Sequence, residues 1–228
     1  MNGTLYGVSV GPGDPGLITV QAVEVIRACE VIAVPRSSDD AERVALGIAQ
    51  RAVPELNEKE LVELFMPMTR DPGKLEAARA AAVETVAEYL RAGRDVAFLT
   101  IGDVTVYSTY GYLHKHVKTI GFPAEMIAGV PSFCAAAARL GESLTDAAKP
   151  LHIIPAPYDG LEEALGLPGT KVLMKSGKYF GEVRRLLAAQ GVNAQIVERC
   201  GLPGERVFHS LEEAPGDAGY LSIIVVKE

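Results

Sequence analysis

The sequence predicts an α/β fold in which mostly parallel sheets are covered by helices. Apolar segments of strand length alternate with segments of helical period over most of the 228 residues, the pattern that βα units produce. Hydrophobic residues make up 48% of the chain and charged residues 22%, which is typical of a globular protein with a core. Glycine and proline, at 23 and 14 residues, supply the turns between segments.

The amino-terminal half begins with a strand, a turn and a helix. Thr4–Gly11 is predicted to be the strand, Pro12–Gly16 the turn, and the helix begins near Thr19, where apolar residues recur at helical spacing. Asp95–Thr100 is strongly apolar, which predicts a central strand buried on both faces. The other predicted strands are Val31–Pro35 and Glu60–Phe65, and the other helices are Ala41–Val53, the Ala-rich Lys74–Arg91 ended by Gly93, and Tyr107–Ile120.

The pattern restarts after the turn at Gly121–Pro123, and we place the boundary between two small domains there, residues 1–121 and 122–228. Strands that follow one another without helices near the carboxyl terminus predict a mixed, partly parallel sheet in the second domain. The predicted strands are Ala124–Ala128, Leu151–Ile154, Lys171–Met174, Ala194–Glu198, Arg206–His209 and Tyr220–Lys227, and the predicted helices are Ser132–Leu140 and Gly181–Ala189. Pro155–Gly169 is rich in proline and glycine and is predicted to be a loop.

The charge of the chain excludes some partners. A net charge of −7 argues against broad binding to nucleic acid or to an anionic membrane, because both need a basic field. No apolar run approaches the roughly 20 residues of a membrane helix. The first basic residue is Arg27, unlike the charged start of a signal peptide. We therefore expect a cytoplasmic protein.

Cysteine and histidine predict neither a disulfide framework nor a metal site. Cys29, Cys134 and Cys200 lie far apart and form no CxxC pair. The histidines are equally dispersed, and His114 and His116 point to different sides of a helix. We expect no metal bound by the protein.

One local motif suggests a hydrolase. Gly7–Gly11 matches GxSxG, the pattern of a nucleophile elbow, which places an activated serine at a turn between a strand and a helix. Ser9 falls inside the predicted first strand instead. The motif therefore favours a structural serine.

A second motif suggests a dinucleotide site. Gly11–Gly16 matches GxGxxG and lies between a strand and a helix. Pro12 and Pro15 remove two of the N–H donors that such a site aims at a pyrophosphate. An NADP enzyme that uses Arg36 remains an alternative, as does a rigid turn without a ligand.

Four spaced segments together resemble one family. They are Tyr6–Ala22, which reads YGVSVGPGDPGLITVQA; Ala97–Thr109, which contains GDVTVYST; Ala128–Ala138, which contains GVPSF; and Val172–Lys175. In the same order they resemble the signature segments of the tetrapyrrole methylases, which transfer a methyl group from S-adenosylmethionine to porphyrin-like rings and leave S-adenosylhomocysteine. The resemblance spans nearly the whole chain, and four ordered matches are more specific than any one of them.

Further segments resemble one branch of that family, which methylates carbon 20 of precorrin-2 or of its cobalt form during corrin (cobalamin) biosynthesis. These segments are Val34–Ser38, Met66–Asp71, Val106–Thr109 and Ala135–Leu140. The chain departs from the family at Val104, where a proline usually follows Gly102-Asp103. Valine relaxes the backbone restriction that proline imposes, but the cofactor contacts expected in this loop are mostly main-chain.

The resemblance implies the tetrapyrrole methylase fold, with a cleft between two domains that holds the cofactor beside the tetrapyrrole, and a homodimer. Carried over by motif position, the cofactor residues are Pro12, Gly102, Asp103, Val106, Ser132, Phe133 and Met174. Physical chemistry agrees for several of them, because glycine permits close approach, a carboxylate accepts hydrogen bonds and a helix start offers N–H groups. For Asp103, Ser132 and Met174 the alternatives are a turn, a plain helix cap and core packing.

The implied substrate carries many carboxylates, so its site needs cationic side chains. Arg36, Lys175 and Lys178 adjoin the matched segments and are expected to bind these carboxylates, with solvated surface charge as the alternative for Lys178. Tyr107 is the candidate catalytic residue, for a hydrogen bond to the substrate or its departing proton, with buried packing as the alternative.

The expected mechanism needs no protein nucleophile. The reduced tetrapyrrole is the carbon nucleophile and the sulfonium carries the methyl group, so the protein aligns them in a dry cleft. The sequence leaves open whether the substrate contains cobalt and whether another ring carbon is methylated. An NADP-dependent oxidoreductase and a non-catalytic tetrapyrrole-binding protein remain alternatives from other classes.

Overall fold

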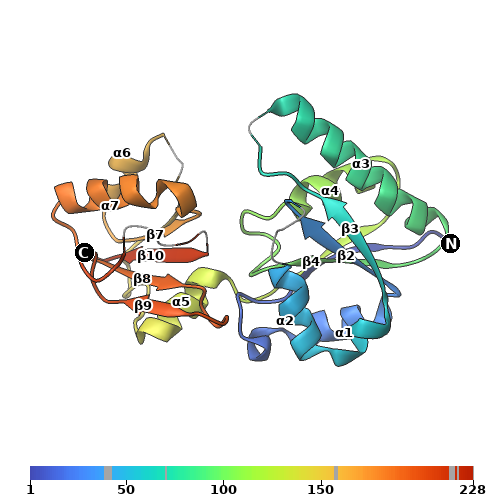
Figure 1. The fold of residues 1–228 in the computed structure, drawn as a ribbon, viewed down its shortest axis with the longest axis horizontal. Helices are drawn as coiled ribbons and strands as arrows, with labels where there is room; N and C mark the ends of the chain where they lie inside the picture. Colours follow the sequence, from blue (N-terminus) through green and yellow to red (C-terminus); the bar gives the residue numbers. More distant parts are fainter. Residues whose placement is uncertain (39–42, 70, 157–158, 216–218, 220, 228) are drawn as a thin grey trace. The chain divides into compact units, whose positions relative to one another are not determined.

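The chain folds into two α/β units, Met1–Pro131 and Ser132–Glu228, each with its own five-stranded sheet (Figure 1). The computed structural model describes residues 1–38, 43–69, 71–156, 159–215, 219 and 221–227. The predicted α/β class, with one parallel and one mixed sheet, is confirmed. The units divide after Pro131 and not after the predicted residue 121, because β5 (Ala124–Ile127) pairs with β1 (Leu5–Ser9) of the first sheet.

The amino-terminal unit is built on a parallel sheet with strand order β3-β2-β4-β1-β5. The remaining strands are β2 (Val31–Arg36), β3 (Glu60–Phe65) and β4 (Val96–Thr100). All pairings between neighbouring strands of this sheet are parallel. β4 is buried at every residue, which confirms the predicted central strand.

Helices cover both faces of this sheet. α3 (Pro72–Arg91) and α4 (Tyr110–Thr119) lie on one face, and α1 (Val20–Ala28) and α2 (Val44–Ala52) on the other (Figure 1). Two short 3₁₀ helices, η1 (Pro15–Leu17) and η2 (Pro54–Glu58), join these elements. Residues 41 and 42, where α2 was predicted to begin, lie outside the described residues.

Helix capping sets the starts of α1 and α3. The Thr19 hydroxyl accepts a hydrogen bond from the Ala22 N–H at 3.2 Å, as expected for a residue that caps α1. α3 begins at Pro72 and not at the predicted Lys74, because Asp71 accepts from the N–H groups of Gly73 and Lys74. Proline suits this first helical position because its missing N–H would have no partner there.

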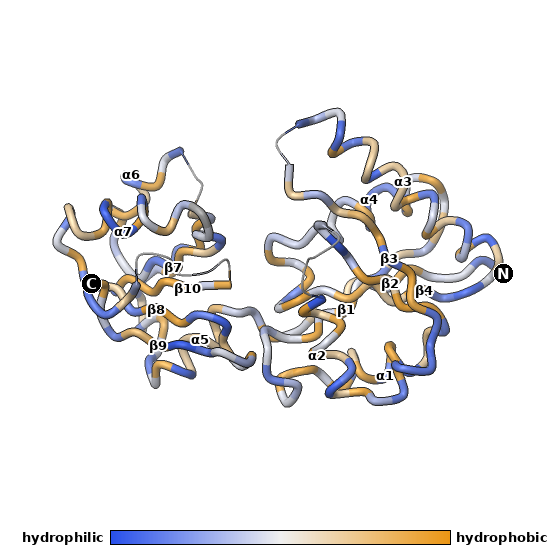
Figure 2. Tube along the Cα trace, viewed as in Figure 1, coloured by the Kyte–Doolittle hydropathy of each residue, from blue (hydrophilic) through white to orange (hydrophobic). Residues whose placement is uncertain are grey.

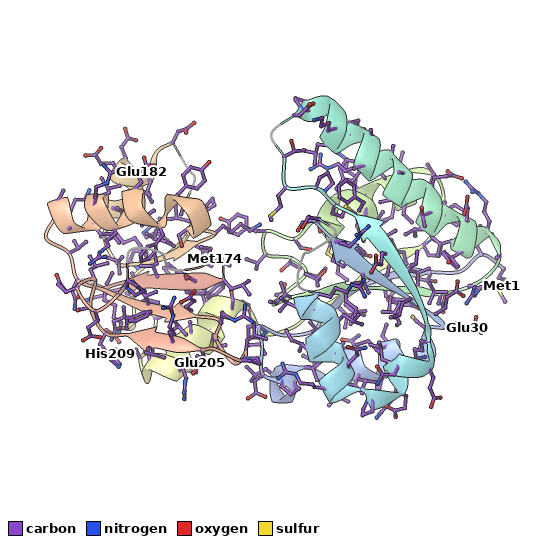
Figure 3. The ribbon with its side chains drawn as sticks, in the orientation of Figure 1. Met1, Glu30, Met174, Glu182, Glu205 and His209 are labelled. Atoms are coloured by element: carbon purple, nitrogen blue, oxygen red, sulfur yellow. The ribbon has the colours of Figure 1, made fainter. Side chains whose placement is uncertain are left out.

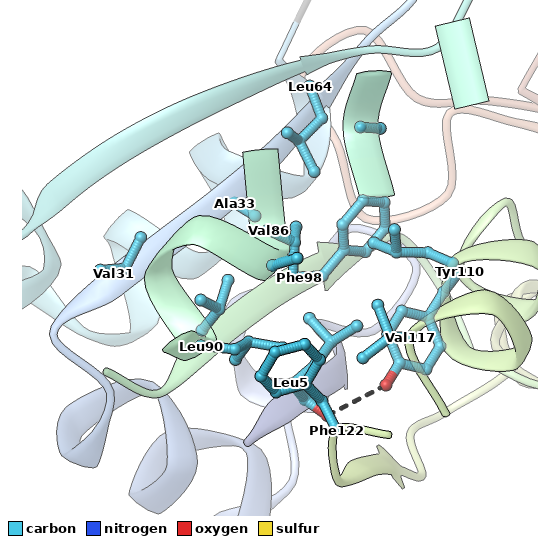
Figure 4. Close-up of a cluster of buried hydrophobic side chains, with 14 of the residues drawn as sticks. Leu5, Val31, Ala33, Leu64, Val86, Leu90, Phe98, Tyr110, Val117 and Phe122 are labelled. Carbon is cyan, nitrogen blue, oxygen red and sulfur yellow. Dashed lines mark hydrogen bonds between the residues drawn. The ribbon is translucent and has the colours of Figure 1, made fainter. Parts of the chain in front are cut away.

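A core cluster of the amino-terminal unit includes Tyr110 (Figure 4). Tyr110 is fully buried, and its hydroxyl donates to the carbonyl oxygens of Glu125 at 2.6 Å and Leu5 at 3.2 Å. A Cβ atom at Gly7 would lie 2.3 Å from the tyrosine ring. Tyr110 therefore fixes β1 beside β5, and β1 needs glycine at this position.

The carboxyl-terminal unit is built on a mixed sheet with strand order β6-β7-β10-β8-β9. β6 and β7 are parallel, and the other neighbours are antiparallel. The strands are β6 (Leu151–Pro155), β7 (Thr170–Met174), β8 (Ala194–Glu198), β9 (Arg206–Phe208) and β10 (Ser222–Val226). Tyr220, where the last strand was predicted to begin, lies outside the described residues.

The helices of this unit are α5 (Ser132–Leu140), α6 (Leu161–Leu165) and α7 (Phe180–Ala189), with a 3₁₀ turn η3 (Gly177–Tyr179). α6 lies in the segment predicted to be a loop, and that prediction was wrong because Leu161 and Leu165 share one buried helical face. Figure 2 shows β4 and β10 as hydrophobic along their length, whereas hydrophobic and hydrophilic residues alternate along α3. Within the described ranges, no helix is both long and apolar enough to cross a membrane.

Candidate functional site

Three loops of the amino-terminal unit leave the same edge of its sheet. β1, β4 and β5 are parallel, so their carboxyl ends lie together, and α/β sheets bind ligands at such an edge. The loops are Gly11–Gly16 after β1, Gly102–Ser108 after β4 and Ala128–Pro131 after β5. We call this edge, with its three loops, the carboxyl edge of the first sheet.

Ser9 links all three strands at this edge. Its hydroxyl donates to the Ile127 carbonyl on β5 at 2.7 Å and accepts from the Val104 N–H beyond β4 at 2.8 Å. Ser9 is fully buried in β1, so it cannot meet an external substrate as a hydrolase nucleophile would. The structural role predicted for Ser9 is what the structure shows.

Two glycines bring the first two loops into direct contact. The Gly102 N–H donates to the Gly11 carbonyl at 2.8 Å, which forms an isolated antiparallel bridge. Gly11 has φ of 76° and Gly102 has φ of 73°, a left-handed conformation that residues with a side chain seldom adopt. Both glycines are therefore required for the loops to meet.

Asp103 holds the second loop against the third. Its Oδ1 accepts from the backbone N–H of Thr105 at 2.8 Å and from the Thr105 hydroxyl, and its Oδ2 accepts from the Gly129 N–H at 2.7 Å. Burial raises the pKa of Asp103, but the hydrogen bonds from Gly129 and Thr105 outweigh it and leave the pKa below its usual value. The carboxylate is thus ionised, and it organises the loops.

Gly129 closes the contact from the side of β5. A Cβ atom at this position would lie 2.4 Å from the Ser9 Cβ and 3.0 Å from the Gly102 carbonyl oxygen. A side chain at residue 129 would therefore push apart the loop of β5 and the two strands that Ser9 connects.

Contacts from its own residues and from α2 hold the loop after β1. Pro12 is buried, the Asp14 carboxylate accepts from the Gly16 N–H at 2.8 Å, and the Arg51 guanidinium of α2 donates to the Gly13 carbonyl at 2.7 Å. Side chains of the turn itself and of α2 therefore stabilise one conformation of the turn.

The second loop ends in a strained residue. Tyr107 has φ of 49°, and 43% of its surface is exposed, so the buried packing considered for it does not occur. α4 begins at Tyr110 and not at the predicted Tyr107, because the Ser108 hydroxyl accepts from the Tyr110 N–H at 3.0 Å. Val106 is half-buried in the same loop.

Arg36 ends β2 at the same edge of the sheet. Its Nε lies 3.2 Å from Glu63 Oε2 on β3, and Glu63 also forms an ion pair with Arg43. The guanidinium is half-buried. Arg36 therefore places a positive charge at the edge and shares an acidic partner with a second arginine.

The carboxyl-terminal unit carries the other predicted site residues. Ser132 and Phe133 open α5, as predicted, with Ser132 half-buried and Phe133 buried. Met174 ends β7 and is buried (Figure 3). The side chain of Lys178, within η3, lies outside what the structure describes.

Lys175 follows β7 with φ of 59°. Burial lowers the pKa of its half-buried ammonium group. The next residue, Ser176, is fully buried, and its hydroxyl has no hydrogen-bond partner among the described residues. The end of β7 thus presents a strained, partly desolvated cation.

Comparison with known proteins decides the family. The sequence profile of the tetrapyrrole (corrin/porphyrin) methylases matches residues 4–215. This chain is a tetrapyrrole methylase. The oxidoreductase interpretation of Gly11–Gly16 is therefore set aside.

Several relatives of this methylase have names that describe their reaction. It is 32% identical to the cobalt-precorrin-2 C(20)-methyltransferase of Salmonella typhimurium, over 100% of this chain and 98% of that protein. It is 33% identical to the precorrin-2 C(20)-methyltransferase of a Sinorhizobium species, over 98% and 95%. The cobalamin biosynthesis protein CobIJ of Mycobacterium tuberculosis is 35% identical over 98% of this chain, which spans about half, 46%, of that longer protein.

A solved structure agrees with the fold of this methylase. The uroporphyrin-III C-methyltransferase of Thermus thermophilus, in complex with S-adenosylhomocysteine, superposes with a TM-score of 0.71 at 22% identity. The match covers 99% of this chain and 92% of that one.

Val104 forms a hydrogen bond that proline could not form. The proline that the family resemblance leads us to expect there has no N–H, whereas Val104 donates its N–H to the Ser9 hydroxyl at 2.8 Å. The departure from the family pattern therefore adds a hydrogen bond to the carboxyl edge.

Sequence reasoning missed the loop between β8 and β9 of this methylase. Arg199 follows β8 with φ of 52°, and the Glu205 carboxylate accepts from the Gly201 N–H at 2.7 Å. The sequence signal was the pair Gly201 and Gly204, which both have positive φ, directly after a predicted strand. Among the described residues, no group of three or more His, Cys, Asp or Glu side chains is placed to hold a metal ion.

Proposed function

We propose that this chain is an S-adenosylmethionine-dependent methyltransferase that methylates carbon 20 of precorrin-2 or cobalt-precorrin-2. The observation that carries the proposal is the match to relatives named for that reaction. The identity is about one third, and the match covers nearly the full length of this chain and of each relative. Those names include both the metal-free and the cobalt-containing substrate, so the proposal covers both. Cobalt, where present, arrives with the substrate.

The amino-terminal unit offers a fitting place for the cofactor. Pro12, Gly102, Asp103 and Val106 are the proposed contacts, and they belong to the loops that Ser9 and the Gly11–Gly102 bridge hold together. Gly102 lets a ligand approach its backbone closely. Asp103 supports the site through Thr105 and Gly129, and its carboxylate retains lone pairs that can accept from a ligand hydroxyl or amino group. When bound, S-adenosylmethionine supplies an electrophilic methyl group on a sulfonium.

Ser132, Phe133 and Met174 are the proposed cofactor contacts of the carboxyl-terminal unit. Ser132 opens α5, where helix N–H groups are available to ligand oxygens. Phe133 and Met174 are apolar and buried, and would exclude water from the ligand. These three assignments rest on the family resemblance.

The substrate is a polycarboxylate, and cations are its proposed partners. Arg36, Lys175 and Lys178 fill that role in the proposal. Arg36 already lies 3.2 Å from Glu63, so a substrate carboxylate would compete with that glutamate for the guanidinium. The lowered pKa of Lys175 means that its ammonium form would gain from pairing with a carboxylate.

The protein's contribution to the reaction is alignment and water exclusion. The ring carbon is the nucleophile, so no side chain needs to attack, which agrees with the complete burial of Ser9. A rigid loop holds reacting groups in line without reorganisation, and positioning of this kind is worth about 7–11 kcal/mol of a barrier. Tyr107, exposed at the end of the second loop, is the proposed partner of the substrate or of the proton that leaves carbon 20.

The test is an anaerobic assay with methyl-labelled S-adenosylmethionine, with precorrin-2 and its cobalt complex in parallel. Mass spectrometry and NMR would locate the new methyl group. Label at carbon 20 supports the proposal, and the preferred substrate decides the role of cobalt. Label at another carbon, or tetrapyrrole binding without transfer, contradicts it.

A calorimetric control tests the cofactor loop. Asp103→Ala is expected to bind S-adenosylhomocysteine at least tenfold more weakly than the wild type, because losing a hydrogen bond to a charged group costs about 1.5–3 kcal/mol. Gly111→Ala, on a helix where an added Cβ meets nothing within 4 Å, is the matched control. Equal affinity in Asp103→Ala and wild type would remove this loop from the cofactor site.

We also propose that the chain acts in the cytoplasm as a homodimer. The dimer rests on the family resemblance, and the location on the sequence expectation given above. Light scattering after size-exclusion chromatography, at two protein concentrations, checks the dimer, and a mass equal to one chain at both would contradict it.

A further inference from the structure

Backbone strain in this chain is concentrated after the carboxyl ends of strands. In the described part of the chain, four residues other than glycine have a left-handed backbone: Tyr107, Ala147, Lys175 and Arg199, with φ of 49°, 41°, 59° and 52°. Side chains disfavour this conformation, and residues held in it cluster at ligand sites. Ala147 is the exception, in the loop ahead of β6.

Lys175 and Arg199 occupy equivalent positions on neighbouring parts of the second sheet. Each is the first residue after its strand, β7 for Lys175 and β8 for Arg199. Both strands are antiparallel to β10, which lies between them, so they run in the same direction and end at the same edge. Two strand spacings separate the residues, which places their backbones about 10 Å apart.

The loop after β8 is held firmly enough to keep Arg199 strained. The Arg199 N–H donates to the Leu221 carbonyl at 2.9 Å, and the Arg199 carbonyl accepts from the Leu202 N–H at 2.8 Å. Glu205 binds the Gly201 N–H from the other end of the loop at 2.7 Å. Strain persists only where the surrounding contacts determine the backbone in this way.

Two glutamates at the ends of this loop form ion pairs with arginines. Glu198 Oε2 lies 2.5 Å from Arg206 Nη2, and Glu205 Oε1 lies 2.5 Å from Arg139 Nε. Arg199 Nε donates to the Pro203 carbonyl at 2.9 Å, which orients its guanidinium group. The loop therefore combines paired carboxylates with an oriented cation.

We infer that Arg199 is a substrate-binding residue that, with Lys175, binds peripheral carboxylates of the tetrapyrrole at this edge of the second sheet. The inference rests on the proposed function for the identity of the substrate. A planar guanidinium binds a carboxylate through two parallel hydrogen bonds. Two cationic side chains whose backbones lie about 10 Å apart suit a ring that carries carboxylates on several side chains. Glycine would relieve the strain at both positions, so it removes each side chain without straining the loop.

The test replaces each strained residue by glycine, as Arg199→Gly and Lys175→Gly, with Ala147→Gly as the matched control. Fluorescence titration with sirohydrochlorin, a metal-free polycarboxylate tetrapyrrole, reports substrate affinity. We expect the Kd to rise about tenfold to a hundredfold in Arg199→Gly, because the lost contact is charged. Ala147→Gly should keep the wild-type Kd. Relief of strain should keep the melting temperature of all three at or above that of the wild type.

Two further measurements separate charge recognition from loop structure. Arg199→Gln keeps a side chain and removes the charge, so its Kd should rise as in Arg199→Gly and should depend less on salt than the wild-type Kd. Arg199→Lys should recover part of the affinity. Binding of S-adenosylhomocysteine, measured in parallel, should change less than twofold.

The outcomes distinguish the inference from the proposed function. Weak tetrapyrrole binding in the Arg199 variants, with no methyl transfer by the wild type to precorrin-2 or its cobalt form, supports the inference and contradicts the proposed reaction. Methyl transfer at carbon 20 by the wild type, with Kd values within twofold in Arg199→Gly and Arg199→Gln, overturns the inference and leaves the reaction standing. A wild type that does not bind sirohydrochlorin also overturns the inference.

Discussion

The two units present their loops in different ways. At the carboxyl edge of the first sheet, Ser9 and Asp103 connect loops that follow different strands. In the second sheet, Glu205 stabilises the single loop after β8 and joins it to α5 through Arg139. A parallel sheet makes neighbours of distant segments, so one buried polar side chain can support several loops. We therefore expect the effect of a substitution in the first unit to extend over several loops, and the effect of one in the second unit to stay within its own loop.

The largest effect is expected from Gly129→Ala. The added Cβ would lie 2.4 Å from the Ser9 Cβ, so β5 must move or Ser9 must lose its hydrogen bonds. We expect a loss of unfolding free energy of about 2–4 kcal/mol for the amino-terminal unit, from overpacking plus the lost bonds. Hydrogen exchange would measure it through faster exchange in β1, β4 and β5 together.

Gly181→Ala is the counterpart in the second unit. Gly181 lies in α7, and an added Cβ meets nothing within 4 Å, so alanine should stabilise the helix by about 0.5–1 kcal/mol. Exchange that accelerates in β5 alone in Gly129→Ala would contradict the connected edge.

Asp103→Asn should have the next largest effect. The amide keeps one acceptor and turns an NH₂ group toward the donors of Thr105 or Gly129, which costs about 1–3 kcal/mol. The difference from wild type depends on pH, because the folded-state pKa of Asp103 is lowered. Its stabilisation is fully present above the unfolded value of about 3.9 and is lost as the pH falls through the lower folded value.

Denaturant unfolding at pH 7 and at several values below pH 4 would follow this difference. It should be constant above about pH 5 and shrink on acidification. A difference that grew as the pH fell would mean that Asp103 is stabilised in its protonated form.

Val104→Pro should have a smaller effect. The substitution restores the residue usual in the family and removes the N–H that donates to Ser9 at 2.8 Å. We expect a loss of about 1 kcal/mol in the first unit, with the affinity for S-adenosylhomocysteine unchanged by calorimetry. An affinity that falls tenfold would show that the bond to Ser9 also shapes the cofactor loop.

The smallest effect is expected from Glu205→Gln. Its partner Arg139 is 59% exposed although Glu205 is only 18% exposed, so the ion pair is screened from one side and contributes about 0–1 kcal/mol, and glutamine keeps an acceptor for the Gly201 N–H. Hydrogen exchange should accelerate around Gly201 and leave the strands of the first sheet unchanged. Faster exchange in β1 or β5 would contradict the expectation that effects in the second unit stay local.

The sequence predicted the elements more completely than the contacts between them. β3 and α5 have their predicted bounds, because the spacing of apolar residues that indicates a strand or a helix can be read within the segment itself. α6 was missed, since its two buried leucines lie among prolines and glycines. The boundary was placed too early, because the pairing of β5 with β1 joins residues far apart in the sequence.

Site prediction had the same limit. Motif order indicated Gly102 and Asp103, but their partners Gly11, Thr105 and Gly129 depend on how three loops meet. The left-handed backbone of Arg199 gave no sequence signal of its own. Local pattern therefore selects candidate residues, and long-range pairing decides what each one contacts.

The position of β5 at the edge of the first sheet, beside β1, determines when the sheet can be completed during synthesis of the chain. β1 is complete at Ser9, yet its partner residues on β5 begin at Ala124, so one side of β1 stays unpaired while the intervening chain is made. Contacts of such high sequence separation slow folding. On a ribosome, where amino-terminal segments emerge first, the carboxyl edge assembles only once Gly129 has left the exit tunnel. A nascent chain stalled before that point would carry a sheet with an open strand and an incomplete cofactor loop.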